Sequence, residues 1–253
     1  MKAGRILEME KYVTAKGSAS MEELCQQFDV SINTVRRDVV ELIRRGTVEK
    51  VYGGVTARRS EQALTPYAER RSNRESVKAA IGRKAAEMVQ DGDIIFIDSG
   101  TTTLQMIDHL ANVRDLTVIT NNMEAVIRAL PYENITVIVL PGQLSRKTNS
   151  LTGDDTVSSL RRYNVRVAFM AATGLSVHGA TNSSPREYEI KRAAVDRCDK
   201  AVLLVNQEKI GVTGLMTFAP LNAFDAVVTD TKPDSEAAQI LYKENVELIS
   251  VSI

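Results

Sequence analysis

The side chains most suited to specific chemistry lie together in one short stretch of this sequence. The stretch reads Ser31-Ile32-Asn33-Thr34-Val35-Arg36-Arg37. Asparagine and arginine pair with adenine and guanine edges through two hydrogen bonds, and serine or threonine hydroxyls bind either a base or a phosphate. A helix over these residues would therefore present a face that can read DNA. Because Arg36-Arg37 could equally be a solvated charged pair, the surrounding elements have to decide between the two interpretations.

Two helices separated by a tight turn are expected here. Ser20 and Glu23 form the S-x-x-E capping box, and the apolar residues after them indicate a helix from about residue 20 to 28. Only two residues then precede Ser31, which is a good N-cap for the next helix. That second helix has an apolar face at i, i+3, i+7 and i+10, formed by Ile32, Val35, Val39 and Leu42. The asparagine and arginines are therefore expected to point outward.

A β-hairpin is expected after the second helix. Val48, Lys50 and Tyr52 alternate with their neighbours and lead into Gly53-Gly54, which is the signal of a hairpin turned by glycine. Residues 30–59 hold seven Lys or Arg against three acids, whereas residues 1–29 hold four against five. The basic charge thus lies where phosphates would lie. The pattern predicts a winged helix-turn-helix with DNA-binding residues Ser31, Asn33, Thr34, Arg36, Arg37, Lys50 and Tyr52.

The composition of the whole chain limits the other possibilities. The 253 residues are 43% hydrophobic, with 32 basic and 32 acidic side chains, so DNA binding must depend on local charge rather than on a polycationic character. The sequence has neither an apolar run of membrane-spanning length nor a leader-like start, which favours a cytoplasmic protein without membrane contact. Cys25, Cys198, His109 and His178 lack metal-ligand spacing and are interpreted as structural, so no metal site is expected.

Three parts are predicted along the chain: a DNA-binding domain over residues 1–57, a linker arm over 58–76 and a sensor domain over 77–253. We expect Tyr67 to pack the polar arm against the body. A helix from about residue 74 to 90 should end at Asp91-Gly92-Asp93. Continuous apolar runs then alternate with helical patterns, which is typical of a mainly parallel sheet covered on both faces. These runs are residues 94–97, 116–119, 135–140, 165–170, 201–205, 226–228 and 246–251.

Small and polar residues follow several of these strands. Asp98 to Thr103 follow the first run, Thr120-Asn121 the second, Pro141-Gly142 the third and Ala171 to Gly174 the fourth. Right-handed crossovers bring the carboxyl ends of parallel strands to one rim, where glycines and hydroxyls can hold an anion. Several such loops together favour a small polar or anionic ligand, although each alone could be an ordinary capped turn. The P-loop and dinucleotide signatures are absent, so no nucleotide cofactor is expected.

Over nearly its whole length the chain resembles the DeoR family of bacterial transcriptional regulators. The resemblance is carried by VSINTVRRDVVEL and YGGV in the first part, and by FIDSGTTT, VITNN, the G-A-T at 179–181, the E...KR at 187–192 and VVTD at 227–230. It implies a winged helix-turn-helix joined to an α/β sensor domain with a mainly parallel sheet, similar to ribose-5-phosphate isomerase and the CoA-transferases. Family members usually repress sugar-catabolic operons and leave DNA when a phosphorylated sugar, polyol or sugar acid binds.

The candidate effector-binding residues come from this resemblance together with the rim pattern. They are Asp98, Ser99, Gly100, Thr101, Thr102, Thr120, Asn121, Gly142, Arg146, Lys147, Gly174, Lys191 and Lys209. Two departures from the family pattern, Gln143 and the stretch from Asn206 to Glu208, put the identity of the effector in question. Arg146 and Lys147 could neutralise a phosphate if their loop folds over the rim, and otherwise belong to a solvated loop.

Glu187 and Lys191 also have simpler structural explanations. Residues 184–187, Ser-Pro-Arg-Glu, form a capping box with proline at the first helical position. Lys191 lies one turn after Glu187 on the same helical face, so an ion pair between the two is as plausible as a contact between Lys191 and a phosphate.

Three functions follow from these observations. The first is a DNA-binding regulator, by family habit a repressor of a carbohydrate operon, that binds operator DNA as a homodimer or higher oligomer and is released by a phosphorylated effector. The second is a sugar-phosphate isomerase with a DNA-binding head, which needs a positioned carboxylate. The stretch FMAATGLS lacks the acid of such isomerases, and Asp98 is explained more simply as a partner of sugar hydroxyls. The third is a DNA-binding protein without an effector, against which the polar strand ends argue.

Overall fold

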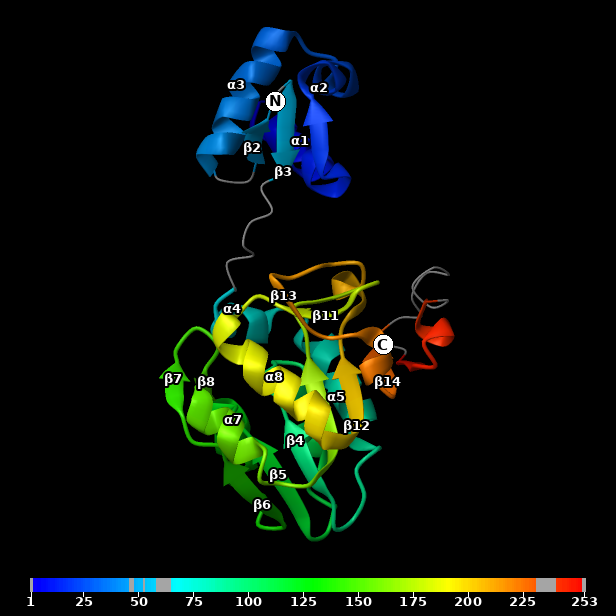
Figure 1. Cartoon of the computed structure of the whole chain (residues 1–253). Helices are drawn as coiled ribbons and strands as arrows, with labels where there is room; N and C mark the ends of the chain where they lie inside the picture. Colours follow the sequence, from blue (N-terminus) through cyan, green and yellow to red (C-terminus); the bar gives the residue numbers. More distant parts are fainter. Residues whose placement is uncertain (1, 46–47, 52, 58–64, 231–239, 252–253) are drawn as a thin grey trace. The chain divides into compact units, whose positions relative to one another are not determined.

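The computed structural model describes residues 2–45, 48–51, 53–57, 65–230 and 240–251. The chain divides into two compact units, residues 1–63 and residues 64–253 (Figure 1). The predicted linker falls partly on residues 58–64, which lie outside the described residues. Residues 67–72, which belong to the same predicted arm, form the short helix α4 Tyr67–Ser72, and the buried Tyr67 packs into the hydrophobic core of the second unit as expected.

The first unit combines helices with a small antiparallel sheet. Its helices are α1 Lys2–Lys16, α2 Met21–Phe28 and α3 Ile32–Arg45, and its strands β1 Ser18–Ser20, β2 Val48–Val51 and β3 Gly54–Ala57 pair in the order β1-β3-β2. Val35, Val39 and Leu42 of α3 are buried as predicted. Ile32 was expected in the same apolar face but is 37% exposed, because it is the first residue of α3 and the buried packing begins only at Val35.

Local signals explain how α2 and α3 begin. The backbone N–H of Glu23 donates to Ser20 Oγ at 3.1 Å, which is the capping half of the predicted box. The pKa of the Glu23 carboxyl is lowered by hydrogen bonds from Lys16 and Tyr12, the latter at 2.5 Å, and also by one from the Ser20 backbone, which is the return half of the box. Asp29 ends α2 in the left-handed region, with φ of 47°, and this residue turns the chain into α3. The predicted helix-turn-helix and hairpin are therefore confirmed.

The second unit is built on a seven-stranded sheet whose neighbouring strands are all parallel, in the order β15-β14-β12-β9-β4-β5-β6. All seven apolar runs predicted from the sequence are present as its strands. Their bounds are β4 Ile94–Ile97, β5 Leu116–Thr120, β6 Ile135–Val139, β9 Val165–Ala171, β12 Cys198–Leu204, β14 Ala226–Thr229 and β15 Glu247–Ser250.

Helices cover both faces of this sheet (Figure 1). Ile95 and Ile97 point into a core formed with α5 Glu75–Ala86, the 3-10 helix η1 Thr103–His109 and α6 Met123–Ala129, whereas Phe96 points into the opposite core formed with α7 Asp154–Leu160 and α8 Pro185–Arg197. The alternation along β4 therefore serves two cores, which is why the strand is continuously apolar. Helix α5 begins at Glu75 as predicted but ends at Ala86, earlier than expected.

Smaller elements follow several strands of this sheet and were not predicted. Strands β7 Gln143–Ser145 and β8 Ser150–Thr152 form an antiparallel hairpin. Strands β10 Gly174–Ser176, β11 Gly179–Asn182 and β13 Met216–Ala219 form a second antiparallel sheet, and short 3-10 turns occupy Gln207–Lys209 and Leu221–Ala223. Each of these strands has only three or four residues, which is too short for its periodicity to identify it.

Candidate nucleic-acid interface and anion site

The outer face of α3 is exposed, and its side chains have hydrogen-bonding groups available for a partner. Asn33, Arg36 and Arg37 are exposed, and no described residue accepts a hydrogen bond from their side chains. The next residue, Asp38, is buried and accepts from Arg5 Nε at 2.7 Å, so this pair ties α1 to the inner face of α3. The outward residues therefore sit on a rigidly held helix with their hydrogen-bonding groups free.

The start of α3 and the hairpin hold the remaining predicted DNA-binding residues. Ser31 Oγ lies 3.0 Å from Thr34 Oγ1 and accepts from the Thr34 backbone N–H at 3.4 Å, a long contact consistent with the predicted N-cap. Lys50 is exposed on β2. Tyr52 lies outside the described residues.

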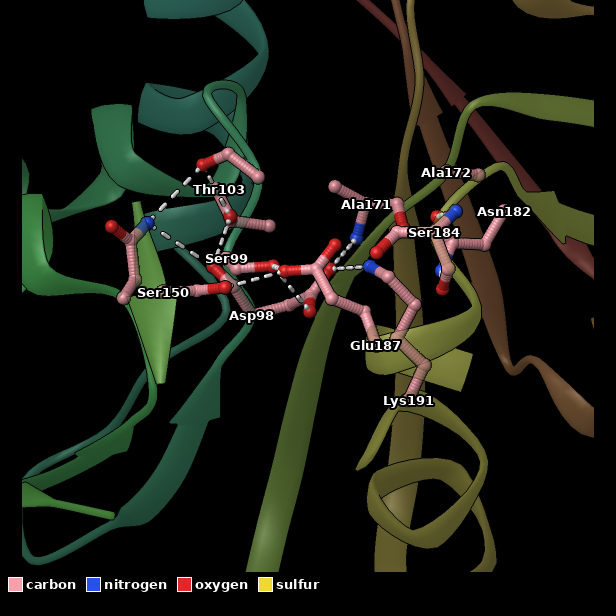
Figure 2. Close-up of polar contacts among 12 residues, drawn as sticks. Asp98, Ser99, Thr103, Ser150, Ala171, Ala172, Asn182, Ser184, Glu187 and Lys191 are labelled. Atoms are coloured by element: carbon pink, nitrogen blue, oxygen red, sulfur yellow. Dashed lines mark hydrogen bonds and ion pairs between the residues drawn. The ribbon is translucent and has the colours of Figure 1, made fainter. Parts of the chain in front are cut away.

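A buried ion pair occupies the carboxyl end of β4. Asp98 is fully buried, and its Oδ2 binds Lys191 Nζ of α8 and accepts from the Ala171 backbone N–H at 3.0 Å (Figure 2). Lys191 Nζ also donates to the Ala171 carbonyl at 3.0 Å. One sequence interpretation is thereby corrected: Lys191 pairs with Asp98 rather than with Glu187. A contact between Asp98 and sugar hydroxyls stays a prediction. The fully buried Asp98 carboxylate needs a cation and hydrogen bonds. If Lys191 paired with Glu187 along α8 instead, Asp98 would have no cation.

Glu187 lies beside this pair and links three elements. Its Oε1 accepts from Ser99 Oγ at 2.6 Å, after β4, and from Ser150 Oγ at 2.7 Å, on β8 (Figure 2). The predicted capping box at the start of α8 is wrong, because the Ser184 side chain makes no capping hydrogen bond and the Glu187 side chain turns to the two serines. The tertiary hydroxyl donors satisfy the buried carboxylate with two bonds, where a capping box would have offered one.

Three more cations gather near this network. The pKa of Lys209 is lowered to about 8, chiefly by burial and then by repulsion from Lys78, Arg70 and Lys191. The pKa of Lys78 and that of Arg70 are also lowered, in both cases mainly by burial. Attraction from Glu187, Tyr67 and Asp98 partly opposes the shift at Arg70. The contacts agree with these shifts, because Lys191 and Lys209 bind the adjacent carbonyls of Ala171 and Ala172 and Lys78 binds the carbonyl of Arg70. These four side chains, Arg70, Lys78, Lys191 and Lys209, are called the basic cluster.

Among the described residues, three members of this basic cluster donate hydrogen bonds only to carbonyl oxygens, and the Arg70 guanidinium also lies over the Tyr67 ring, 5.4 Å from its centroid. Arg70 Nε donates to the Thr65 carbonyl at 3.0 Å, Lys78 Nζ to the carbonyls of Arg70 and Asn73, and Lys209 Nζ to the Ala172 carbonyl at 3.1 Å. Lys191 alone has a carboxylate partner, Asp98. The cluster therefore holds positive charge that the protein's own direct contacts leave unneutralised.

The other predicted effector residues lie at the strand ends in mostly structural contacts. Thr120 Oγ1 donates to the Ile97 carbonyl at 2.6 Å, and Thr101 Oγ1 lies 3.5 Å from the Arg70 carbonyl. Gly100, Thr102, Asn121 and Gly174 are buried, and Gly142 is exposed. A Cβ on Gly174 would meet the Val212 carbonyl at 2.2 Å, so this glycine lets the 206–213 segment that carries Lys209 pack closely.

Arg146 and Lys147 are exposed in the turn between β7 and β8. The described residues of the basic cluster give neither side chain a hydrogen bond or ion pair, and neither contributes to the lowered pKa of Lys209. The two residues remain predictions, and the structure brings Lys191 and Lys209 together without them.

Arg70, Lys78, Ser150 and Glu187 were not in the predicted site. One signal in the sequence could have identified Lys78. It lies three and seven positions before Ile81 and Ala85, on the apolar face of α5, and is itself buried. A lysine at a core position of an amphipathic helix needs a special explanation. Arg70 has no such signal, because it lies on a six-residue helix in a polar stretch.

Comparison with known proteins identifies the family to which both regions belong. The model of the DeoR-like helix-turn-helix domain matches residues 5–61, and that of the DeoR C-terminal sensor domain matches residues 72–231. The chain belongs to the DeoR family. Like other DeoR regulators, it carries its helix-turn-helix in the N-terminal unit and its sensor in the second.

Curated relatives match this DeoR-family chain almost end to end. The HTH-type transcriptional regulator IolR of Bacillus subtilis is 40% identical over 240 residues, which cover 94% of this chain and 95% of that protein. The glycerol-3-phosphate regulon repressor of Escherichia coli is 28% identical over 237 residues, covering 93% and 94%. Both are transcriptional regulators and not enzymes, which favours the regulator over the isomerase.

Among solved structures, the chain is also similar to a ribose 5-phosphate isomerase. Ribose 5-phosphate isomerase A of Methanocaldococcus jannaschii has a TM-score of 0.40 and 20% identity, over 54% of each chain. None of the helices described for this DeoR regulator is long and apolar enough to cross a membrane. Its described residues form no group of three or more His, Cys, Asp or Glu side chains that could hold a metal ion.

Proposed function

We propose that this DeoR regulator represses a carbohydrate-catabolic operon and is released from its operator by a phosphorylated sugar, polyol or sugar acid that binds at the basic cluster. The observation that carries the proposal is the cluster itself: among the described residues, Arg70, Lys78 and Lys209 have no carboxylate partner and donate hydrogen bonds only to carbonyl oxygens. Keeping such charges close together and partly buried is unfavourable until an anion arrives. A phosphate dianion would neutralise this excess.

Two buried amides support a ligand with hydroxyl groups. The side-chain oxygens of Asn121 and Asn206 are buried, follow β5 and β12, and have no hydrogen-bond partner among the described residues. An unpartnered buried acceptor is costly, and a hydroxyl donor would satisfy it. The name of the glycerol-3-phosphate regulon repressor, a relative over 93% of the chain, is consistent with an effector that joins hydroxyls to a phosphate.

Helix α4 offers a route from this site to the DNA-binding unit. Arg70 lies on α4, and the chain continues from α4 through residues 58–64 to the first unit. Arg71 of the same helix pairs with Glu124 of α6 at 3.0 Å. A phosphate that draws Arg70 toward Lys78 and Lys209 would therefore pull on the segment that leads to α3. A differential of about 1.4 kcal/mol between two arrangements suffices for a tenfold loss of operator affinity.

On DNA, we propose a homodimer or higher homo-oligomer that places two α3 helices in successive major grooves. Asn33, Arg36 and Arg37 would contact base edges, and Ser31, Thr34, Lys50 and Tyr52 would contact bases or phosphates. Half-sites would then be centred about 34 Å apart, or a multiple of that.

The proposal is tested with Lys209→Met and a matched control, Lys200→Met, at an exposed lysine of β12. Thermal shifts are measured with inorganic phosphate and with a panel of phosphorylated sugars, polyols and sugar acids beside their unphosphorylated forms. Operator release is measured on DNA from the upstream region of the gene. Only phosphorylated compounds should stabilise the wild type and Lys200→Met, by about 2.7 kcal/mol at 100 times the dissociation constant. Equal stabilisation of Lys209→Met would rule out the basic cluster as the phosphate site.

A further inference from the structure

We propose that Glu187 is an internal anion which occupies the effector's phosphate subsite in the empty protein, and which an incoming phosphate displaces from Ser99 and Ser150. The inference rests on the proposed function and goes beyond it, because it names the protein's own competitor for that subsite and a further subsite made of two hydroxyls.

The geometry of Glu187 is that of a bound anion rather than of a structural ion pair. Its Oε1 accepts two short hydrogen bonds, from Ser99 Oγ at 2.6 Å and from Ser150 Oγ at 2.7 Å. The donors come from positions 88 and 37 residues away, after β4 and on β8, so the contact depends on tertiary structure. Only 4% of Glu187 is exposed, and no lysine or arginine among the described residues forms an ion pair with it.

The electrostatic surroundings point to the same conclusion. Asp98 is neutralised by direct contact with Lys191, so it is already satisfied. The Glu187 charge instead acts on Arg70 from a distance, where it raises the pKa against the effect of burial. Two converging hydroxyl donors beside unneutralised cations are what a phosphate oxygen requires. In the empty protein a carboxylate of the chain accepts those donors.

This arrangement has a consequence for affinity. A phosphate that enters the basic cluster meets the like charge of Glu187 and must take over the hydroxyls of Ser99 and Ser150. Glu187 therefore lowers the affinity for phosphate and sets the effector concentration at which the regulator responds. When Glu187 leaves the two serines, the hydrogen bond that joins α8 to β8 is broken. Binding of phosphate therefore changes the contacts of both elements. Thr148 Oγ1, which lies 2.7 Å from both Ser150 Oγ and Ser145 Oγ, extends that link to β7.

The experiment measures inorganic phosphate binding, at fixed ionic strength, to full-length wild type and Glu187→Gln. The amide keeps the size of the side chain and an oxygen acceptor for the serines while it removes the charge. We expect Glu187→Gln to bind phosphate at least about tenfold more tightly. Glu187→Asp keeps the charge and should not show this gain. Ser150→Ala keeps Glu187 charged and removes one hydroxyl donor, so it should bind no more tightly than wild type.

Equal or weaker phosphate binding by Glu187→Gln overturns the inference, because it would mean that Glu187 does not oppose the anion. If neither protein binds phosphate and Lys209→Met behaves like wild type with every phosphorylated compound, the proposed function itself fails. A second measurement covers the case in which Glu187→Gln does not fold. In wild-type protein labelled at the glutamate carboxyl carbons, one NMR signal, absent from Glu187→Asp, should move on adding phosphate, and an unmoved signal overturns the inference.

Discussion

The outer face of α3 and the rim of the sensor sheet differ in exposure and in how their residues are brought together. Asn33, Arg36 and Arg37 are exposed side chains from one helix turn, and no described residue accepts hydrogen bonds from them. Asp98 and Lys191 are buried partners from elements 93 positions apart. A polymer as large as DNA can be read by a convex helix, whereas a small ligand must be surrounded. The first site is therefore local in sequence, and the second is assembled from several strand ends and helices.

The largest expected effect is on the stability of the rim. Lys191→Met would leave the fully buried Asp98 carboxylate without its cation, and such removal costs about 3–5 kcal/mol. The free energy of unfolding, followed by circular dichroism in urea, should fall by that amount. In the double variant with Asp98→Asn no buried charge is stranded, so much of the loss should be recovered. A loss of less than about 1 kcal/mol in Lys191→Met would mean that the pair is not buried as described.

The next largest effect is on DNA binding and sharpens the contrast between the two regions. Arg37→Ala removes an exposed side chain that no described residue binds, so the unfolding free energy should change by less than about 0.5 kcal/mol. Operator affinity should fall by about 1–3 kcal/mol, or roughly 5 to 150-fold, if Arg37 reads a base edge. Arg83→Ala on the exposed side of α5 serves as control. A parallel loss of phosphate binding in Arg37→Ala would show that the two regions are not separable.

A pH dependence is expected in the sensor alone. With a pKa of about 8 in the ligand-free protein, Lys209 is partly neutral in mildly alkaline solution, and a bound phosphate would raise its pKa. The complex then holds more protons than the free protein, so phosphate affinity should fall as pH rises through about 8, by at most about tenfold per pH unit. Calorimetric titrations at several pH values test this, and the phosphate affinity of Lys209→Met should depend less on pH. An equally steep fall in that variant would assign the effect to another group.

The same lowered pKa affects stability in the opposite direction. The unfolded chain binds more protons than the folded one between about pH 8 and the ordinary lysine pKa of 10.5. Stability of the ligand-free protein should therefore rise with pH across this window. Urea unfolding of wild type and Lys209→Met, compared at both ends of the window, measures the contribution of this one lysine.

The smallest expected effect is the difference in stability loss when the serine of each predicted capping box is replaced. Ser20 Oγ accepts from the Glu23 backbone N–H, so Ser20→Ala should cost about 1 kcal/mol in the first unit. The Ser184 side chain makes no capping bond, so Ser184→Ala should cost less than about 0.5 kcal/mol. Equal losses of stability in thermal melts of the two variants would contradict the conclusion that only the Ser20 side chain caps its helix.

The sequence alone determined the elements whose cause is local. Ser20 and the apolar spacing after it determine α2, and continuous β-rich runs determine the seven strands of the sensor sheet. The outward position of Asn33, Arg36 and Arg37 follows from the period of α3. Such features depend on neighbours within a few residues, and a helix or strand period is enough to recover them. The polar residues that follow the strands also indicated the rim at which Asp98 meets Lys191 and at which Lys209 lies.

Only the tertiary structure decided which charges meet at that rim. Spacing along α8 favoured a bond from Glu187 to Ser184 or to Lys191, yet Glu187 binds Ser99 and Ser150, and Lys191 binds Asp98. Arg70 and Lys78 join the cluster because α4 and α5 pack beside the strand ends. A buried charge selects its partner by the free energy of leaving water, and the partners available after folding are set by which elements cross, not by distance along the chain.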